Sequence, residues 1–280
     1  MALRSPIYLD TETLLSQAEY HDIDVPRQTD IVEKTVRKRS GRGKAGLSGF
    51  GVDASAGTDV EYQSTYSLEP KEKATVSKVI DSLITNAAVK VNPDSDTALC
   101  KDDLIELEGN TRITAASMAG KMFFIFRRLM DTAEGDLETI FDIDVNDLPV
   151  TEQLKQVYLQ NELLPIPILL ELTDSTLPQR VYVNVRADHF IDEASANRVE
   201  GELRLLGTVW RLIPEGNEGY LSAEDWLLYG WEHMLRRKLM PQVEEVVKDM
   251  VNQFQLSLPA EDVHAYISGP AIVVDAIALY

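Results

Sequence analysis

The stretch Val199–Pro214, VEGELRLLGTVWRLIP, is the longest strand-like run in the sequence, and it decides the expected fold. Alternating apolar residues up to Leu205 lie on one face, whereas from Trp210 onward the apolar residues follow the opposite phase. The inward face therefore changes near Gly207, where a β-bulge would bend the strand, because glycine tolerates the backbone that a bulge needs. We expect a long, bent central strand over 199–214.

Shorter runs on both sides of this strand predict further strands. The final run, AIVVDAIALY at 271–280, is too apolar for a frayed tail, so we expect the C-terminal strand to lie within the sheet. The dipeptide Gly109-Asn110 separates two short runs and is typical of a two-residue hairpin turn. The other expected strands cover residues 7–9, 104–108, 111–114, a run that ends at Leu172 after Pro165 and Pro167, 181–185 and 263–268.

Apolar residues at helical spacing predict several amphipathic helices. Asp10 or Thr11 can cap a first helix, because a side-chain oxygen at that position accepts a hydrogen bond from a free amide of the first turn. Ser222 and Asp225 approximate a capping box for a last helical region, which Pro241 is expected to break or kink because proline lacks the helical donor. The remaining expected helices cover residues 70–87, 118–130 and 152–163.

These elements indicate an α+β fold with a mixed or antiparallel sheet and flanking amphipathic helices. The acidic run at 131–147 holds seven acids and no base, and we place a soft boundary there. The expected organisation is an N-terminal strand and helix over 1–33, a basic glycine-rich arm or edge strand over 34–69, a helical and hairpin subdomain over 70–147, and a sheet-containing α+β domain over 148–280.

The charge balance limits the classes of partner. The chain has 46 acidic and 27 basic residues and a formal net charge of −19, which argues against a general surface for nucleic acid or anionic membrane. The single Cys100 excludes an intrachain disulfide and fits a reducing compartment. The start of the sequence lacks the apolar core of a signal peptide, and no run of 18 apolar residues occurs. We therefore expect an acidic cytoplasmic protein with no transmembrane segment.

Residues 34–44, KTVRKRSGRGK, depart from this acidic pattern. The segment has six positive charges and no acid, so the rest of the chain carries −19 − 6 = −25. One interpretation is an arm that binds phosphate groups or the acidic face of a partner, and the other is a solvated loop that balances an acidic body. The candidate partner-binding residues are Lys34, Arg37, Lys38, Arg39, Arg42 and Lys44.

The segment that follows alternates with a period of two over residues 50–62. Its glycines and alanines offer little side-chain area, so we expect it to order against a partner or to form an edge strand. A strand contributed to a membrane barrel is a further alternative. GRGKAG at 41–46 has glycine spacing like that of a dinucleotide loop, but no apolar strand precedes it and no helix follows it, so we expect no nucleotide cofactor.

Four stretches together resemble a bacterial family known only as a domain of unknown function. They are the opening IYLDTETLLSQ, the glycine-rich KAGLSGFGVDASAG, the central GELRLLGTVWRLIP and the final SGPAIVVDAIALY, in that order. The resemblance covers nearly the whole chain and implies a cytoplasmic protein of about this length. It implies no catalytic residue.

The sequence contains no recognised catalytic or metal-binding motif. Its four histidines are scattered, and no nucleophile elbow is present. Asp142, Asp144 and Asn146 resemble the start of a calcium loop, but the glycine and glutamate required later in the loop are missing. Asp188, His189, Asp192 and Glu193 cluster in a loop and could be metal ligands or merely polar residues, and we favour the second interpretation. We expect no cofactor, no metal and no catalytic residue.

Three hypotheses for function follow. The first is a non-enzymatic interaction or regulatory protein whose basic arm, over about 34–63, engages a protein partner. The second is a bacterial defence or stress component that binds nucleic acid or a membrane surface through the same arm. The third is a carboxylate- and metal-dependent hydrolase with a site assembled from distant residues.

Overall fold

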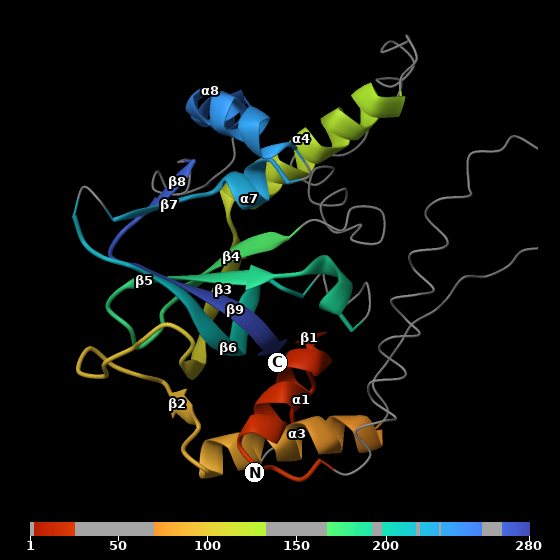
Figure 1. Cartoon of the computed structure of the whole chain (residues 1–280), viewed down its shortest axis with the longest axis vertical. Helices are drawn as coiled ribbons and strands as arrows, with labels where there is room; N and C mark the ends of the chain where they lie inside the picture. The colour runs from red at the N-terminus through yellow and green to blue at the C-terminus, as the bar shows by residue number, and fades with distance from the viewer. Residues whose placement is uncertain are drawn as a thin grey trace, which may run out of the picture.

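The computed structural model describes residues 3–25, 70–132, 167–191, 198–216, 219–229, 231–253 and 265–280. Several predictions lie outside these ranges, among them the arm over 34–63, the calcium-like start at 142–146 and the helix over 152–163. Within the ranges, the chain forms one main sheet with helices packed on its outer side (Figure 1).

Five strands of the main sheet close into a barrel. β3 pairs with β4, β4 with β5, β9 with β6 and β6 with β3, all antiparallel, whereas β5 and β9 are parallel. The predicted α+β class with a mixed sheet is confirmed, but the sheet is closed rather than open. The five strands are β3 (Leu104–Ile113), β4 (Ile168–Thr173), β5 (Arg180–Val185), β6 (Gly201–Ile213) and β9 (Ala271–Leu279).

Two short strands each pair with one strand of the barrel. β1 (Tyr8–Leu9) pairs antiparallel with the end of β9, and β2 (Val89–Val91) pairs parallel with the start of β3. A separate ribbon is formed by β7 (Tyr220–Ser222) and β8 (Tyr266–Ser268). The predicted C-terminal strand in the sheet is therefore confirmed, and the N-terminal strand lies beside it.

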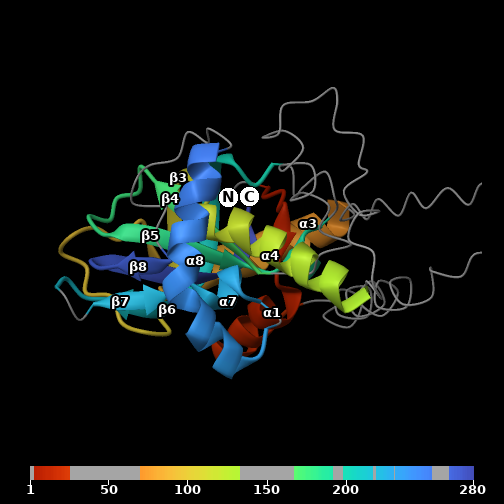
Figure 2. The same ribbon diagram turned by 90° about the horizontal axis from the view of Figure 1, so that it is seen from above.

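Alternate residues of the strands fill the barrel, and the others meet two layers of helices. Leu107, Leu170, Val183, Leu205 and Val274 are completely buried in the interior. One outer layer contains α4 (Ala115–Thr132), α7 (Glu224–Leu227) and α8 (His233–Gln253), and the other contains α1 (Thr11–Tyr20) and α3 (Pro70–Thr85). Figure 1 shows these layers at opposite ends of the molecule, and Figure 2 shows α4 and α8 together over the barrel.

The long strand β6 changes phase later than its sequence predicts, because Leu205 and Val209 both face the barrel interior and Trp210 packs on the outer side. The register between β6 and β9 shifts at Leu206/Gly207, where β9 has the extra residue Ile277, and again after Val209, where β6 has the extra residue Trp210. The predicted bulge of β6 at Gly207 is therefore wrong: the extra residue there belongs to β9, and the bulge of β6 is at Trp210. A methyl group on Gly207 would lie 2.5 Å from the carbonyl oxygen of Asp275, so the glycine permits β9 to approach closely.

Three further local predictions are wrong in whole or in part. Gly109 lies inside β3 rather than in a hairpin turn, because β4 approaches so closely that a Cβ at Gly109 would lie 2.2 Å from a backbone oxygen of Thr173. Of the break or kink predicted at Pro241, the break does not occur: α8 continues through this exposed proline while Met240 and Val243 bury the opposite side of the helix. Ser222 ends β7 and is not the N-cap residue, which is Ala223, but its Oγ accepts a hydrogen bond from the backbone N–H of Glu224 at 3.3 Å.

The two ends of the described chain are joined by a polar cluster. The Arg4 guanidinium pairs with Asp81 and lies over the Tyr280 ring, 5.3 Å from its centroid. The Tyr280 hydroxyl donates a hydrogen bond to the buried carboxylate of Glu106 in β3. Burial and this carboxylate both raise the pKa of the Tyr280 hydroxyl, so it remains a neutral donor.

We predict that Gly207→Ala lowers the free energy of unfolding by about 1–3 kcal/mol, because the added methyl group has no space between β6 and β9. Urea unfolding followed by circular dichroism measures the change. Glu202→Ala, at an exposed position of the same strand, is the control and should change stability by less than about 0.5 kcal/mol. Equal effects of the two substitutions would contradict the close packing of β9 against Gly207.

Candidate functional site

Three adjacent strands carry a polar belt on the outer wall of the barrel. Asn184 of β5 is opposite Asp275 of β9, which is opposite Thr208 of β6, so the three side chains are neighbours across the sheet. In β6 and β9 the outward residues before and after them are apolar and pack under one or the other helix layer, as does Tyr182 before Asn184. The belt therefore lies in the interval between the two layers, where the barrel wall is not covered by apolar side chains.

The N-terminus of α1 closes one side of this interval. Asp10 is the N-cap residue, as predicted, and its carboxylate accepts hydrogen bonds from the backbone N–H of Thr13 at 3.1 Å and from the hydroxyl of Thr13 at 2.9 Å. Tyr8, just before it in β1, is almost completely buried, and its hydroxyl accepts a hydrogen bond from the backbone N–H of Arg186 at 3.3 Å.

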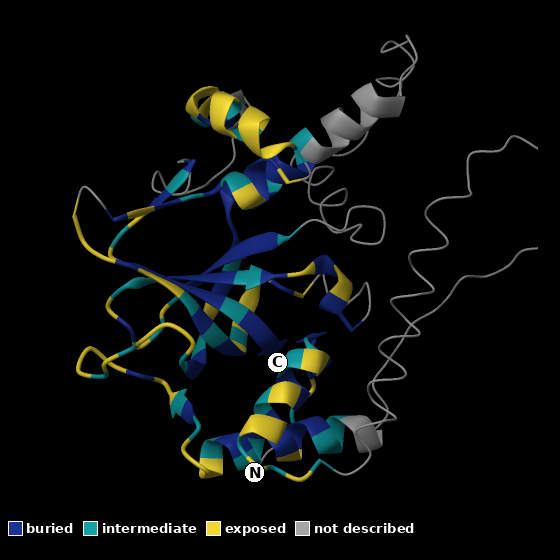
Figure 3. Ribbon diagram, viewed as in Figure 1, coloured by how far each residue is buried: buried dark blue, intermediate teal, exposed yellow. Residues whose placement is uncertain are grey.

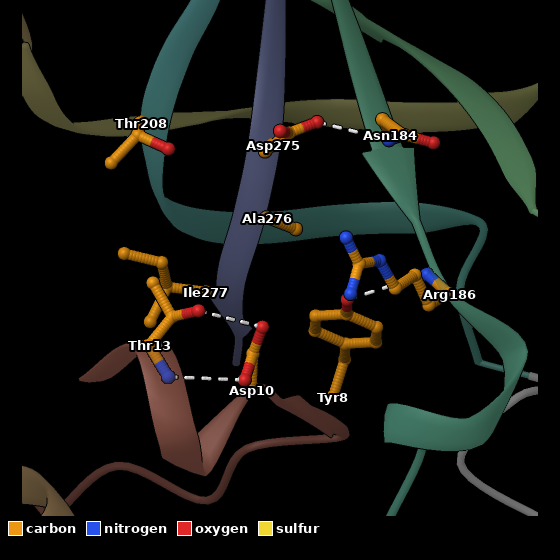
Figure 4. A pocket seen from close by; sticks show the side chains of 9 residues that line it. All are labelled: Tyr8, Asp10, Thr13, Asn184, Arg186, Thr208, Asp275, Ala276 and Ile277. Atoms are coloured by element: carbon orange, nitrogen blue, oxygen red, sulfur yellow. Dashed lines mark hydrogen bonds between the residues drawn. The ribbon is translucent and has the colours of Figure 1, made fainter. Parts of the chain in front are cut away.

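Together these groups enclose a cavity of about 120 Å³. Figure 4 shows Asp10 and Tyr8 on the α1 side, Asp275 and Asn184 on the opposite side, and the Arg186 guanidinium between them. Most groups around the cavity are polar. Its lining residues are Tyr8, Asp10, Thr13, Asn184, Arg186, Thr208, Asp275, Ala276 and Ile277.

Hydrogen bonds hold the far wall of the cavity in place. Asn184 donates from Nδ2 to the Asp275 carboxylate at 2.9 Å, and its Oδ1 accepts a hydrogen bond from Trp226 Nε1 of α7 at 3.0 Å. Because the amide is used on both sides, its orientation is fixed, and so is the position of the carboxylate. The cavity is therefore a preformed feature of the barrel wall.

The pKa of the Asp275 carboxyl is raised by burial and changed in both directions by its neighbours. Burial raises its pKa, and the neighbouring Asp10 carboxylate raises it further by like-charge repulsion. The hydrogen bond from Asn184 and the positive charge of Arg186 lower the pKa, but the net direction is upward. A positive group in the cavity would stabilise the ionised form of Asp275 and so lower its pKa.

His189, which the sequence predicts only as a polar loop residue, is buried in the structure. It ends the short helix η2 (Ala187–His189), is buried, and its Nδ1 lies 3.5 Å from Asp10 and 3.4 Å from the Tyr8 hydroxyl. Asp188 is half-exposed, with a carboxylate oxygen 3.7 Å from His189 Nε2. Asp192 and Glu193 lie outside the described residues. Within the described ranges, no three histidine, cysteine or acidic side chains group as a metal site.

Comparison with protein families gives one match. Residues 3–280 match the family model DUF6414, a domain of unknown function. The chain belongs to this family. The predicted resemblance is thus confirmed for nearly the whole length of this DUF6414 chain. A comparison with curated proteins finds no match, and a comparison with solved structures finds none either.

The candidate residues of the arm remain predictions for this DUF6414 chain, because Lys34, Arg37, Lys38, Arg39, Arg42 and Lys44 lie outside the described residues. The structure instead brings together the polar belt and the first helix, which sequence patterns did not connect. One signal was present: Asp275 is the only charged residue in the apolar run 271–280. No helix in the described ranges is long and apolar enough to cross a membrane.

We predict that Asp275 makes the folded state less stable as the pH rises. Its pKa in the folded protein is raised above 3.8, so the folded state still holds a proton that the unfolded chain has released. The free energy of unfolding should therefore fall as the pH rises from 3.8 through the folded-state pKa. The asparagine of Asp275→Asn cannot titrate, so this variant should lack the decline. Asp10 and Arg186 still face the site in the variant, so only the carboxyl of residue 275 is removed.

Urea unfolding of both proteins over this pH range measures the difference. The stability of Asp275→Asn relative to the unsubstituted protein should increase with pH. Parallel pH profiles would show that the carboxyl has the same pKa in the folded and unfolded states.

A second buried titratable group is Lys121 in α4, only 2% exposed, whose pKa burial lowers from 10.5 to about 7. Protonated Lys121 therefore destabilises the folded state. We predict that Lys121→Met, which keeps the length and helix propensity, stabilises the protein at pH 7 by about 1 kcal/mol or more. The gain should shrink as the pH rises from 7 towards 10.5, because the unfolded lysine then loses its proton too. A gain that is independent of pH in urea unfolding would contradict this.

Proposed function

We propose that this protein is a non-enzymatic interaction or regulatory protein of the cytoplasm, in which the basic arm engages an acidic protein partner. The observation that carries the proposal is the charge distribution. Six cations and no acid occupy residues 34–44, in a chain whose formal net charge is −19. A segment of this kind binds acidic surfaces through Coulomb attraction and hydrogen bonds from arginine and lysine.

The packing of the flanking helices supports this role. Leu14 and Ala18 of α1 are buried with Val79, Ile80 and Leu83 of α3, against the same end of the barrel. In the sequence the arm lies between α1 and α3, and these two described helices belong to a single packed layer. A barrel that is complete without the arm can act as the support from which the arm binds.

The acidity of the remaining chain favours a protein partner over a polyanion. Outside residues 34–44 the formal charge is −25, which repels extended nucleic acid and anionic membrane from the rest of the molecule. A partner with a localised acidic patch can meet the arm without approaching the body. The exposed free thiol of Cys100 is in keeping with a reducing cytoplasm.

We predict that deletion of residues 34–63 abolishes capture of the partner but leaves the melting temperature within about 2 °C of that of the full chain. The physical reason is that β1, α1, α3 and the barrel bury their apolar surfaces among one another. Affinity capture from the host and differential scanning calorimetry measure the two properties. A large fall in melting temperature would instead make the arm part of the core.

Charge variants separate arm-specific binding from a general charge effect. Neutralising Arg37, Lys38 and Arg39 to glutamine should weaken capture, whereas the same change at the exposed Lys101, Arg237 and Lys238 should not. Capture of nucleic acid with a steep dependence on salt would favour the second hypothesis, in which the arm binds phosphate groups. Equal loss in both triple variants would contradict an arm-specific site.

A further inference from the structure

We propose that the cavity between α1 and the polar belt binds a small primary-amine ligand, with the ammonium group held by the Asp10 and Asp275 carboxylates. This site is independent of the arm and lies on the described barrel. The ligand class includes short amines and small amino acids, which share the ammonium group.

The size of the cavity limits the ligand to a few heavy atoms. Its volume of about 120 Å³ is somewhat below the roughly 150 Å³ of a cavity that holds one benzene molecule. A two- or three-carbon amine fits such a space, whereas a nucleotide or a sugar phosphate does not. The polar lining gives the ligand hydrogen-bond partners on every side.

The two carboxylates provide the charge that an ammonium group requires. They come from separate elements, the N-cap of α1 and the outer face of β9, and line the same cavity. An ammonium group has three donors and no acceptor. The Asp275 carboxylate already accepts at Oδ1 from Asn184, which leaves its second oxygen to accept from a ligand, and the Thr208 hydroxyl lies beside it. A bound cation would also remove the repulsion between the two acids.

Arg186 gives the cavity a second, opposite charge. Arg186 is exposed to solvent and also lines the cavity. Figure 4 shows its guanidinium near the Tyr8 hydroxyl. Among the described residues, neither cavity carboxylate is in ion-pair contact with it. A guanidinium binds carboxylates in a planar, bidentate geometry. An amino acid could therefore place its carboxylate on Arg186 and its ammonium group on the acids, whereas a simple amine would use only the acids.

Isothermal titration calorimetry of the full chain tests the site with five probes, namely methylamine, ethanolamine, glycine, acetate and inorganic phosphate, each up to about 10 mM. We expect heat from at least one amine-bearing probe and none from acetate or phosphate. Binding of glycine but not ethanolamine would identify an amino-acid site that uses Arg186, and binding of ethanolamine would identify an amine site. Heat from the anions alone, or from no probe, would overturn the proposal.

Matched variants locate the binding. Asp275→Asn keeps the acceptor for Asn184 and should weaken binding about 10-fold or more, and Asp10→Asn keeps a good N-cap residue and should do the same. Asp96→Asn makes the same charge change at an exposed loop and should leave binding unchanged. Equal affinity in all three variants would overturn the assignment of the site. Failure of the arm deletion to affect partner capture would not bear on this result.

Discussion

The fold depends on the pairing of β6 with both β3 and β9. Over eight consecutive pairs β6 lies beside β3, and on its other edge it pairs with most of β9. This double pairing turns a sheet that starts with β1 and ends with β2 into a closed barrel, and closure removes the unpaired edges of its strands. Gly207 makes the second pairing possible, because a larger residue there would meet the backbone of Asp275.

Closure also decides where the polar groups lie. Once the inward residues fill the barrel, the apolar outward residues pack under one of two helix layers, and polar residues occupy the interval between these layers. Figure 3 shows the strands mostly buried, whereas the outer sides of α1 and α8 are exposed. Asn184, Thr208 and Asp275 lie in the interval and form one wall of the cavity. The candidate site is therefore a consequence of how two helix layers cover a barrel without meeting.

The site joins residues from the two ends of the chain. Tyr8 and Asp10 precede the first helix, and Asp275 lies in the last strand, yet β1 pairs with β9 and places them around one cavity. The same arrangement buries His189 beside Asp10 and Tyr8, although its neighbours in sequence suggest a polar loop.

Local sequence determined most strands and helices and the cap at Asp10, because periodicity and capping depend on residues a few positions apart. It placed the bulge of β6 at Gly207, whereas the extra residue of this strand is Trp210. Tertiary structure decided that Gly109 serves a close approach of β4, that α8 continues through Pro241 and that Asp10 and Asp275 share a cavity. These outcomes depend on which strands become neighbours in space. The pairing of β1 with β9 joins Tyr8 to Leu279, which are 279 − 8 = 271 positions apart, and no local sequence pattern covers such a distance.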